Sequence, residues 1–190
     1  FNRDGLIMGR SDSPLTSDGI RMAKELARIV QAEDVQAVYC SPLGRAVASA
    51  GIYVEGFDVP MFLRESLAEL SCGRWEGRRL SEVKPGGGRL RTFWEERPPG
   101  GESYQDAEAR IGSLIQEACS NAAADRILVV SHAGAMRVFL KLWLGLEPEI
   151  AINIGCPHDR LFILTDSEKI AVRSVRRPDA EGLPIETLLV

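Results

Sequence analysis

Histidine and cysteine are scarce in this chain, which has 2 histidines and 4 cysteines among its 190 residues. The cysteines are far apart in the sequence, and no two of them form the C-x-x-C pair that is typical of zinc sites. The composition therefore gives little support for a metal centre. Thiols that stay unpaired and reduced are typical of cytoplasmic proteins, so we expect a cytoplasmic location.

Excess positive charge and long apolar runs are lacking as well. The 23 lysines and arginines and the 27 aspartates and glutamates give a net charge of −4, which argues against a nucleic acid as partner. An anionic ligand would have to bind in a local pocket. No run of about 18 apolar residues is present, so no membrane-spanning segment is predicted. The length suits a single globular domain over residues 1–190, since domains have roughly 100–200 residues.

Helical and strand patterns alternate along the chain. The first predicted helix ends near Ala32 and has Thr16 or Ser17 as its cap and Ile20 on its apolar face. A second helix is predicted to begin at Pro42, with Ser41 as N-cap. Two more are predicted, one after a capping box of Ser103 and Asp106 and one from His132 to Gly145. Apolar runs predict buried strands at residues 35–40 and 127–130, and a hairpin of residues 161–164 and 170–175 at the sheet edge. This alternation predicts an α/β fold, a three-layer sandwich in which helices flank a mostly parallel central sheet.

Two polar side chains follow predicted strands, and sites in such folds lie at the carboxyl ends of strands. Arg45 falls in the first turn of a helix, where free backbone N–H groups and the helix dipole favour an anion and a guanidinium adds a bidentate fork. His132 is followed by small residues and is a candidate phosphoryl ligand, general acid or base, or nucleophile. A solvated arginine and a core histidine are the alternatives for these two positions.

Glu69 is a third candidate. It lies in a segment with glycines and a tryptophan that we expect to form an ordered loop. A partly buried carboxyl group there would hold a proton for a leaving group, whereas a surface glutamate is the alternative. Glu65 and Glu76 compete with Glu69 for this role.

The rim of a pocket has further candidates. Four arginines are candidates for a basic rim that would bind a phosphorylated ligand: Arg74, Arg78, Arg79 and Arg89. The alternative is that they are simply solvated surface residues. Residues 153–158 follow the last predicted helix and border the expected pocket mouth, which makes His158 a secondary candidate or a turn histidine.

Taken together, these segments resemble the histidine phosphatase superfamily, also called the phosphoglycerate mutase-like family. Four segments carry the resemblance in the family's order and cover nearly the whole chain. They are Asn2-Arg3-Asp4-Gly5 through Gly9-Arg10-Ser11-Asp12-Ser13-Pro14-Leu15-Thr16 and Gly19; Ser41-Pro42-Leu43-Gly44-Arg45-Ala46; Leu67-Ala68-Glu69 through Gly73-Arg74-Trp75-Glu76-Gly77; and Val130-Ser131-His132-Ala133-Gly134. The turn Pro99-Gly100-Gly101-Glu102-Ser103 also fits the family.

The resemblance implies a phosphatase site. According to this resemblance, Arg45 and a protonated His132 belong to the phosphate pocket, and Glu69 is the proton donor. Asn2 would hydrogen-bond the phosphoryl group, with Gly9 and Gly134 beside the substrate. The implied reaction is hydrolysis of a small phosphorylated metabolite through a phosphohistidine, with no metal or other cofactor. A homodimer is a separate expectation for the protein.

One departure from the family pattern concerns the nucleophile. In the family an Arg-His-Gly motif at the end of the first strand supplies it, a few residues before the position of Asn2. That motif is not in the sequence, which starts at Phe1. We expect the natural protein to carry the motif and a strand of roughly five or six residues upstream of Phe1, since neither His132 nor His158 is a convincing replacement.

The resemblance leaves three activities open. Small phosphatases such as the alpha-ribazole phosphate phosphatases are the most similar members. The 32 positions from Glu69 to Gly101 are fewer than in true phosphoglycerate mutases, and a smaller lid gives water better access, which favours hydrolysis. Mutase-type phosphoryl transfer and a catalytically inactive relative that binds phospho-ligands or a protein are the alternatives.

Overall fold

A parallel sheet of three short strands forms the centre of the protein. The computed structural model describes residues 5–120, 124–164 and 170–174. Strand β1 (Ala37–Cys40) pairs with β2 (Met61–Leu63) on one side and with β3 (Ile127–Val130) on the other, in the order β2-β1-β3. All four side chains of β1 are buried, as the apolar run predicts for a strand that is covered on both faces.

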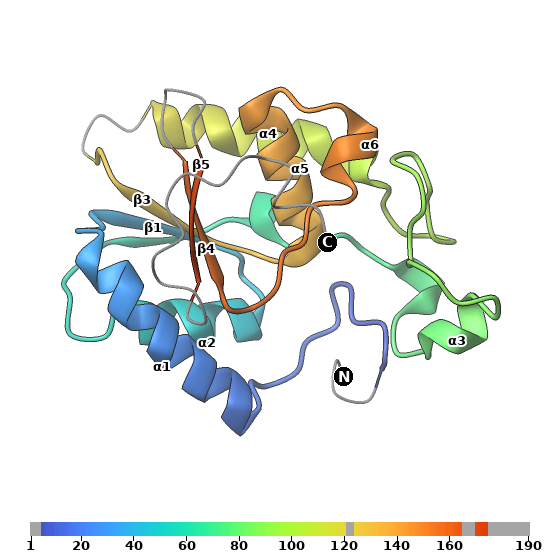
Figure 1. The fold of residues 1–190 in the computed structure, drawn as a ribbon, viewed down its shortest axis with the longest axis horizontal. Coiled ribbons are helices and arrows are strands. Elements are labelled where there is room, and N and C mark those ends of the chain that lie inside the picture. Colours follow the sequence, from blue (N-terminus) through green and yellow to red (C-terminus); the bar gives the residue numbers. More distant parts are fainter. Residues whose placement is uncertain (1–4, 121–123, 165–169, 175–190) are drawn as a thin grey trace.

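Two pairs of helices cover the two faces of the sheet (Figure 1). Helices α1 (Ser17–Ala32) and α2 (Gly44–Tyr53) pack together on one face, and α4 (Tyr104–Cys119) and α5 (Ala133–Leu144) pack together on the other. The predicted α/β fold with three layers is therefore confirmed.

Each helix pair closes its own apolar cluster against β1. Val38 packs with Val30 and Ala46 on the side of α1 and α2, whereas Tyr39 belongs to the cluster that holds Ile111 on the other side. This division follows from strand geometry, because successive side chains of a strand point to opposite faces.

Several predicted helix ends are confirmed. The Thr16 side chain accepts a hydrogen bond of 3.1 Å from the Gly19 N–H. Ser103 and Asp106 form the predicted capping box at the start of α4. Helix α5 ends at Gly145, whose φ of +62° is the left-handed conformation that glycine adopts most readily.

Two predictions about the helices are wrong. Helix α2 begins at Gly44 rather than at Pro42, because the Ser41 hydroxyl accepts a hydrogen bond from the Leu43 N–H (3.3 Å) and closes a turn before the helix starts. Ile20 was expected on the apolar face of α1 but is 39% exposed. The buried residues of α1 begin one turn later, at Ala23, so the first turn of the helix extends beyond the core.

The segment between β2 and α4 has little regular structure. Its single turns are the 3-10 turns η2 (Glu65–Leu67) and η3 (Gly73–Trp75) and the helical turn α3 (Leu80–Val83). The buried Arg91 ties this segment together, because its Nη2 donates to the carbonyl oxygens of Ser71 (2.9 Å) and Glu102 (2.7 Å). Trp94 stacks on Tyr104 with 4.7 Å between ring centroids. The segment is thus fixed without a strand or long helix.

The predicted hairpin near the end of the chain is confirmed, but its predicted place is wrong. After the short helix α6 (Pro148–Ala151), strands β4 (Arg160–Leu164) and β5 (Ile170–Ser174) pair antiparallel. Within the described residues they form a separate sheet of two strands rather than an edge of β2-β1-β3, since β4 pairs with β5 and with no strand of the parallel sheet. The predicted turn at residues 166–168 lies outside the described residues. No helix in the described part of the chain is long and apolar enough to cross a membrane.

Candidate active site

The carboxyl ends of β1 and β3 bring a serine and a histidine together. Ser41 follows β1, and its N–H donates to the Val130 carbonyl at the end of β3 (2.9 Å). His132 is the N-cap residue of α5. Its Nε2 lies 2.7 Å from the Ser41 hydroxyl oxygen, so two segments 91 residues apart meet at this edge of the sheet.

His132 is neutral in this site at pH 7. Burial lowers its pKa to about 4, and the nearby Arg45 charge acts in the same direction, although Glu69 opposes both. We expected a protonated imidazole as a phosphate ligand, and the described site instead holds the neutral form. A dianionic phosphate would add the negative charge that favours the imidazolium, so protonation would accompany ligand binding.

Arg45 lies at the start of α2, where an anion was expected, but the anion there is a side chain of the protein itself. The Asp12 carboxylate accepts hydrogen bonds from the Gly44 N–H (2.6 Å) and the Arg45 N–H (3.4 Å) and forms an ion pair of 3.2 Å with the Arg45 guanidinium. Arg45 also donates to the carbonyl oxygens of Ser11 (2.7 Å) and Gly9 (2.9 Å). Its side chain is only 14% exposed, so these contacts fix its position firmly.

Glu69 lies at the start of α5. Its Oε1 accepts hydrogen bonds from the Leu70 N–H (2.9 Å) and the Ala135 N–H (3.2 Å), and its Oε2 accepts one from the Gly134 N–H (3.2 Å). A Cβ atom at position 134 would come within 2.5 Å of Glu69 Oε1. Only glycine at position 134 allows the carboxylate to approach the helix this closely.

Glu76 holds the loop around Gly9. It accepts hydrogen bonds from the Ser11 hydroxyl (2.7 Å) and from the N–H groups of Arg10 (3.1 Å), Ser11 (2.9 Å) and Cys72 (3.0 Å). Burial opposes ionisation of Glu76, but these hydrogen bonds outweigh it and lower its pKa. Glu76 is therefore a structural carboxylate and a poor proton donor.

Gly9 fits closely beneath Glu76. Its φ is +54°, and an added Cβ would come within 2.4 Å of Glu76 Oε1.

The other competitor for the acid role, Glu65, is exposed in η2. The structural roles of Asp12 and Glu76 could not be predicted from the sequence, because both depend on contacts with backbone N–H groups of distant residues.

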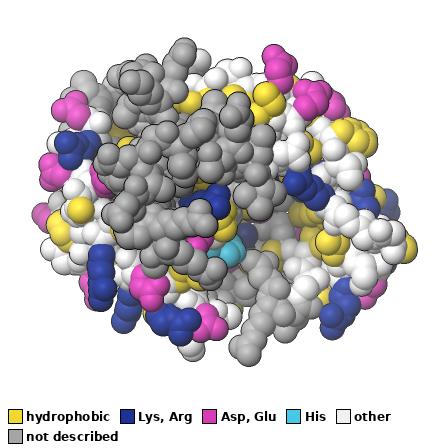
Figure 2. Space-filling model, viewed as in Figure 1, with side chains coloured by type: hydrophobic (Ala, Val, Ile, Leu, Met, Phe, Trp, Pro, Cys, Tyr) yellow, Lys and Arg dark blue, Asp and Glu magenta, His cyan; other side chains and the backbone are white. Residues whose placement is uncertain are grey.

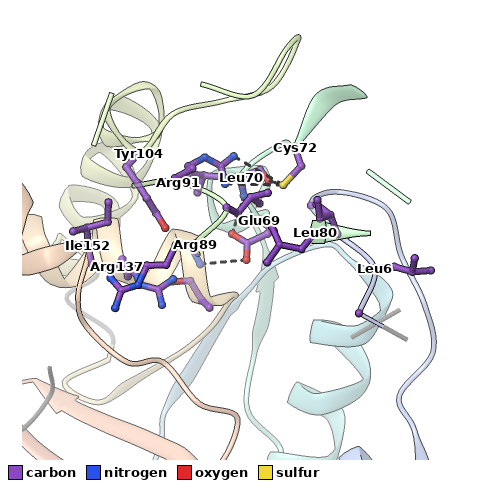
Figure 3. A pocket seen from close by; sticks show the side chains of 16 residues that line it. Leu6, Glu69, Leu70, Cys72, Leu80, Arg89, Arg91, Tyr104, Arg137 and Ile152 are labelled. Carbon is purple, nitrogen blue, oxygen red and sulfur yellow. Dashed lines mark hydrogen bonds between the residues drawn. The ribbon is translucent and has the colours of Figure 1, made fainter. Parts of the chain in front are cut away.

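A pocket of about 470 Å³ opens beside Glu69 (Figure 3). Gly9, Glu69 and Gly134 line it, while Arg45 and His132 lie outside its lining. In Figure 2, basic, acidic and histidine side chains gather around a hollow near the centre of the face shown. Asn2 lies outside the described residues.

Other side chains complete the pocket. Arg89, Arg91, Arg137 and Tyr104 belong to its lining. Of the four arginines considered for a basic rim, Arg89 lines the pocket, whereas Arg74, Arg78 and Arg79 do not. His158 is exposed and is not part of the lining.

Comparison with known proteins decides the family. Residues 1–172 match the model of the histidine phosphatase superfamily (branch 1). The chain belongs to this superfamily. The adenosylcobalamin/alpha-ribazole phosphatase of Salmonella typhimurium is 29% identical over 144 residues, which cover 73% of this chain and 71% of the relative.

A further relative agrees with this assignment, and a solved structure shows the same fold. A protein of Cronobacter sakazakii that is named a probable phosphoglycerate mutase is 32% identical over 151 residues, 77% of this chain and 70% of the relative. The crystal structure of the alpha-ribazole phosphatase from Shigella flexneri superimposes with a TM-score of 0.76 and 23% identity, covering 96% of this chain and 93% of that one. The resemblance to this superfamily and the fold it implies are therefore confirmed.

Proposed function

We propose that the protein hydrolyses phosphomonoesters of small metabolites. The observation that carries this proposal is the convergence of Arg45, His132 and Glu69 at one edge of the sheet, where the charges of Arg45 and Glu69 both act on the His132 imidazole. Phosphoryl transfer needs cations and hydrogen-bond donors around the equatorial oxygens and a proton for the leaving oxygen. The superfamily and the phosphatase named among the relatives support the same chemistry.

Each residue has a role in the proposed reaction. A histidine nucleophile attacks phosphorus in line, the bond from phosphorus to the ester oxygen breaks, and Glu69 gives its proton to that oxygen. Water then attacks the phosphohistidine, Glu69 takes a proton from the water, and inorganic phosphate leaves. Arg45 and His132 bind the oxygens of the transferred group, with Asn2 as a further donor and Gly9 and Gly134 beside the substrate.

The nucleophile in this proposal is a histidine that precedes Phe1 in the natural protein, in one domain with residues 1–190. His132 is hydrogen-bonded to Ser41 and is assigned here to bind the phosphoryl oxygens, and His158 is exposed, so neither is proposed as the nucleophile. The gene upstream of Phe1 should encode an Arg-His-Gly motif. The longer protein should form an acid-labile phosphoenzyme that is lost when this histidine is changed to alanine, and a gene without the motif would contradict the proposal.

Mutase activity is the second candidate function, because one relative is named for it. The test is a phosphate-release assay with p-nitrophenyl phosphate and with phosphoglycerates, with and without a bisphosphoglycerate primer. We expect phosphate release that does not depend on the primer. Primer-dependent interconversion of phosphoglycerates would identify a mutase, and binding of phospho-ligands without turnover would identify an inactive relative.

We also propose a cytoplasmic, metal-independent enzyme. Its cysteines are free, and Cys119 is exposed, which is typical of a reducing compartment. Activity that persists after treatment with EDTA would support independence from metals. A homodimer stays a prediction, for which sedimentation at equilibrium is the direct measurement.

A further inference from the structure

Two arginines from distant segments hold the backbone on both sides of Glu69. Arg110 Nη1 donates to the carbonyl oxygens of Ser66 (2.5 Å) and Ala68 (3.0 Å). The carbonyl of Glu69 itself accepts from Arg10 Nε (3.3 Å). Glu69 lies in neither a helix nor a strand, so no regular pattern of backbone hydrogen bonds fixes its position. The position of its backbone therefore depends on these side chains.

Glu102 joins the two arginines. Its Oε1 accepts from Arg110 Nε (3.2 Å), and its Oε2 accepts from Arg10 Nη2 (3.2 Å). The same Oε2 accepts from the Ser71 N–H (2.9 Å), in the segment that follows Glu69. One carboxylate thus contacts both guanidinium groups and the segment that they hold.

The ion pair between Arg110 and Glu102 is the more shielded of the two. These side chains are 18% and 22% exposed, whereas that of Arg10 is 42% exposed. Removing one partner of a shielded ion pair costs more than removing one of a solvated pair, because the other charge stays behind without a partner. We therefore expect Arg110 and Glu102 to fix the segment more firmly than Arg10 does.

The chain around Glu102 fits closely against the chain that follows Glu69. The Glu102 N–H donates to the Ser71 carbonyl (2.9 Å). A Cβ atom at position 101 would come within 2.5 Å of the same carbonyl oxygen, so glycine at position 101 allows the two segments to approach this closely. Glu102 is thereby held at a fixed distance from the segment that contains Glu69.

The Glu69 carboxylate is the far end of this series of contacts. It accepts from the N–H groups of Gly134 and Ala135 at the start of α5, at 3.2 Å each. The first N–H groups of an α-helix have no acceptor inside the helix, so these two depend on Glu69. A displacement of the Glu69 backbone by roughly 1 Å would lengthen both contacts, and such a displacement of a reacting group can lower a rate by about 10²-fold.

We propose that Arg110 and Glu102 are positioning residues for Glu69. They hold its backbone so that the carboxylate stays at the N-terminus of α5, beside the pocket. Neither side chain lines the pocket, so their effect on the reaction passes through Glu69. This inference rests on the proposed function, in which Glu69 protonates the leaving oxygen.

Hydrogen exchange tests the position of Glu69 without any measurement of activity. In Arg110→Gln the N–H groups of Gly134 and Ala135 should exchange at least about tenfold faster than in the natural protein, since each loses a charged acceptor. The N–H of Val138, buried in α5, reports global opening and should change less. Unchanged exchange at Gly134 and Ala135, or an equal acceleration at Val138, would overturn the inference.

A double-mutant cycle tests the same link in catalysis. Arg110→Gln should lower kcat on an alkyl phosphate by about ten- to hundredfold and on p-nitrophenyl phosphate by less. KM and inhibition by vanadate should stay unchanged, because Arg45 and His132 are not altered. In a Glu69→Gln background the same substitution should cause little further loss, since it acts through Glu69. Losses that multiply fully in the double variant would overturn the inference.

Arg64→Gln is the matched control. Arg64 also forms an ion pair with a residue of α4, through Glu117, but its carbonyl acceptor in the described chain is that of Leu63. The control should keep the exchange rates and the kinetics of the natural protein. An effect as large as that of Arg110→Gln would indicate a general loss of packing and would overturn the inference.

Two further variants cover the case in which Arg110→Gln does not fold. Arg110→Lys keeps the charge but not the fork and should give an intermediate effect, and Glu102→Gln, which removes the charge between the arginines, should act in the same direction as Arg110→Gln. If the natural protein hydrolyses no phosphomonoester, the proposed function fails. The exchange rates at Gly134 and Ala135 then still decide whether these residues position Glu69.

Discussion

Helices α2 and α5 begin at the same edge of the sheet, and each receives a carboxylate from a distant segment at its N-terminus. At α2, Asp12 accepts from the Gly44 and Arg45 N–H groups and also pairs with the Arg45 guanidinium. At α5, Glu69 accepts from the Gly134 and Ala135 N–H groups but forms no ion pair with any described residue.

The difference separates a structural carboxylate from a candidate acid. Burial of Asp12 opposes its ionisation, but hydrogen bonds from Arg45, Gly44 and Ser13 outweigh burial and lower its pKa. Asp12 thus stays charged and balances Arg45. Glu69 has no such counter-charge and lines the pocket. The same property of a helix N-terminus, its free N–H groups, supports the fold at α2 and positions a reactive group at α5.

The largest expected effect comes from Glu69→Gln in the natural protein. Loss of the proton donor should lower kcat on an alkyl phosphate by about 10²–10⁴-fold. The loss on p-nitrophenyl phosphate should be smaller, because that leaving group needs little protonation. Steady-state kinetics on both substrates checks this. Asp12→Asn, which changes the carboxylate at the N-terminus of α2, is the matched control. Equal losses for Glu69→Gln on the two substrates would remove Glu69 from the acid role.

Arg45→Gln should weaken the binding of vanadate and phosphate. A hydrogen bond to a charged group contributes about 1.5–3 kcal/mol, which corresponds to roughly a tenfold to hundredfold rise in Kd. Inhibition by vanadate gives the measurement, and Arg74→Gln is the control that removes a charge elsewhere. Unchanged vanadate affinity in Arg45→Gln would mean that Arg45 only balances Asp12.

His132 should make stability depend on pH. Its folded pKa of about 4 lies below the ordinary value of 6.5, so between these values the unfolded chain binds more protons, and stability is lost as the pH falls from 6.5 toward 4. Proton linkage at His132 alone should lower the free energy of unfolding by about 2 kcal/mol when the pH falls from 7 to 5. Urea unfolding at the two pH values should show a smaller loss in His132→Gln. His158→Gln, which changes an exposed histidine, should show the same loss of stability as the unsubstituted protein. If His132→Gln also showed that same loss, the effect of burial on His132 would be contradicted.

Asp12→Ala should have the smallest effect, a loss of about 1 kcal/mol in the free energy of unfolding, as for a helix cap. The reason is that the Gly44 and Arg45 N–H groups lose their acceptor. Urea unfolding at pH 7 measures it. Asp18→Ala, which removes an exposed ion pair with Arg21, should cost less, about 0.2–0.5 kcal/mol. An equal cost for both variants would mean that Asp12 is no more than a surface charge.

The sequence by itself determined the elements and the family. Local signals were sufficient for the cap at Thr16, the capping box of Ser103 and Asp106, the end of α5 at Gly145, and the strand at residues 127–130, of which Leu128 and Val130 are buried. Each depends on a few neighbouring residues and on the periodicity of apolar side chains. The order of four motifs was enough to identify the superfamily. Fold class and candidate residues were therefore readable before any distance was known.

Only the tertiary structure decided how the site is built. Helix α2 begins later than predicted because the Ser41 hydroxyl accepts a hydrogen bond from the Leu43 N–H and closes a turn there. Within the described residues, β4 and β5 form a sheet of their own, and the sequence pattern of a strand does not contain the identity of its neighbours. The carboxylates at the two helix termini come from 32 and 65 residues away, and burial lowers the pKa of His132 to about 4. Hydrogen bonding and desolvation depend on which distant groups fold together, and no local pattern contains that information.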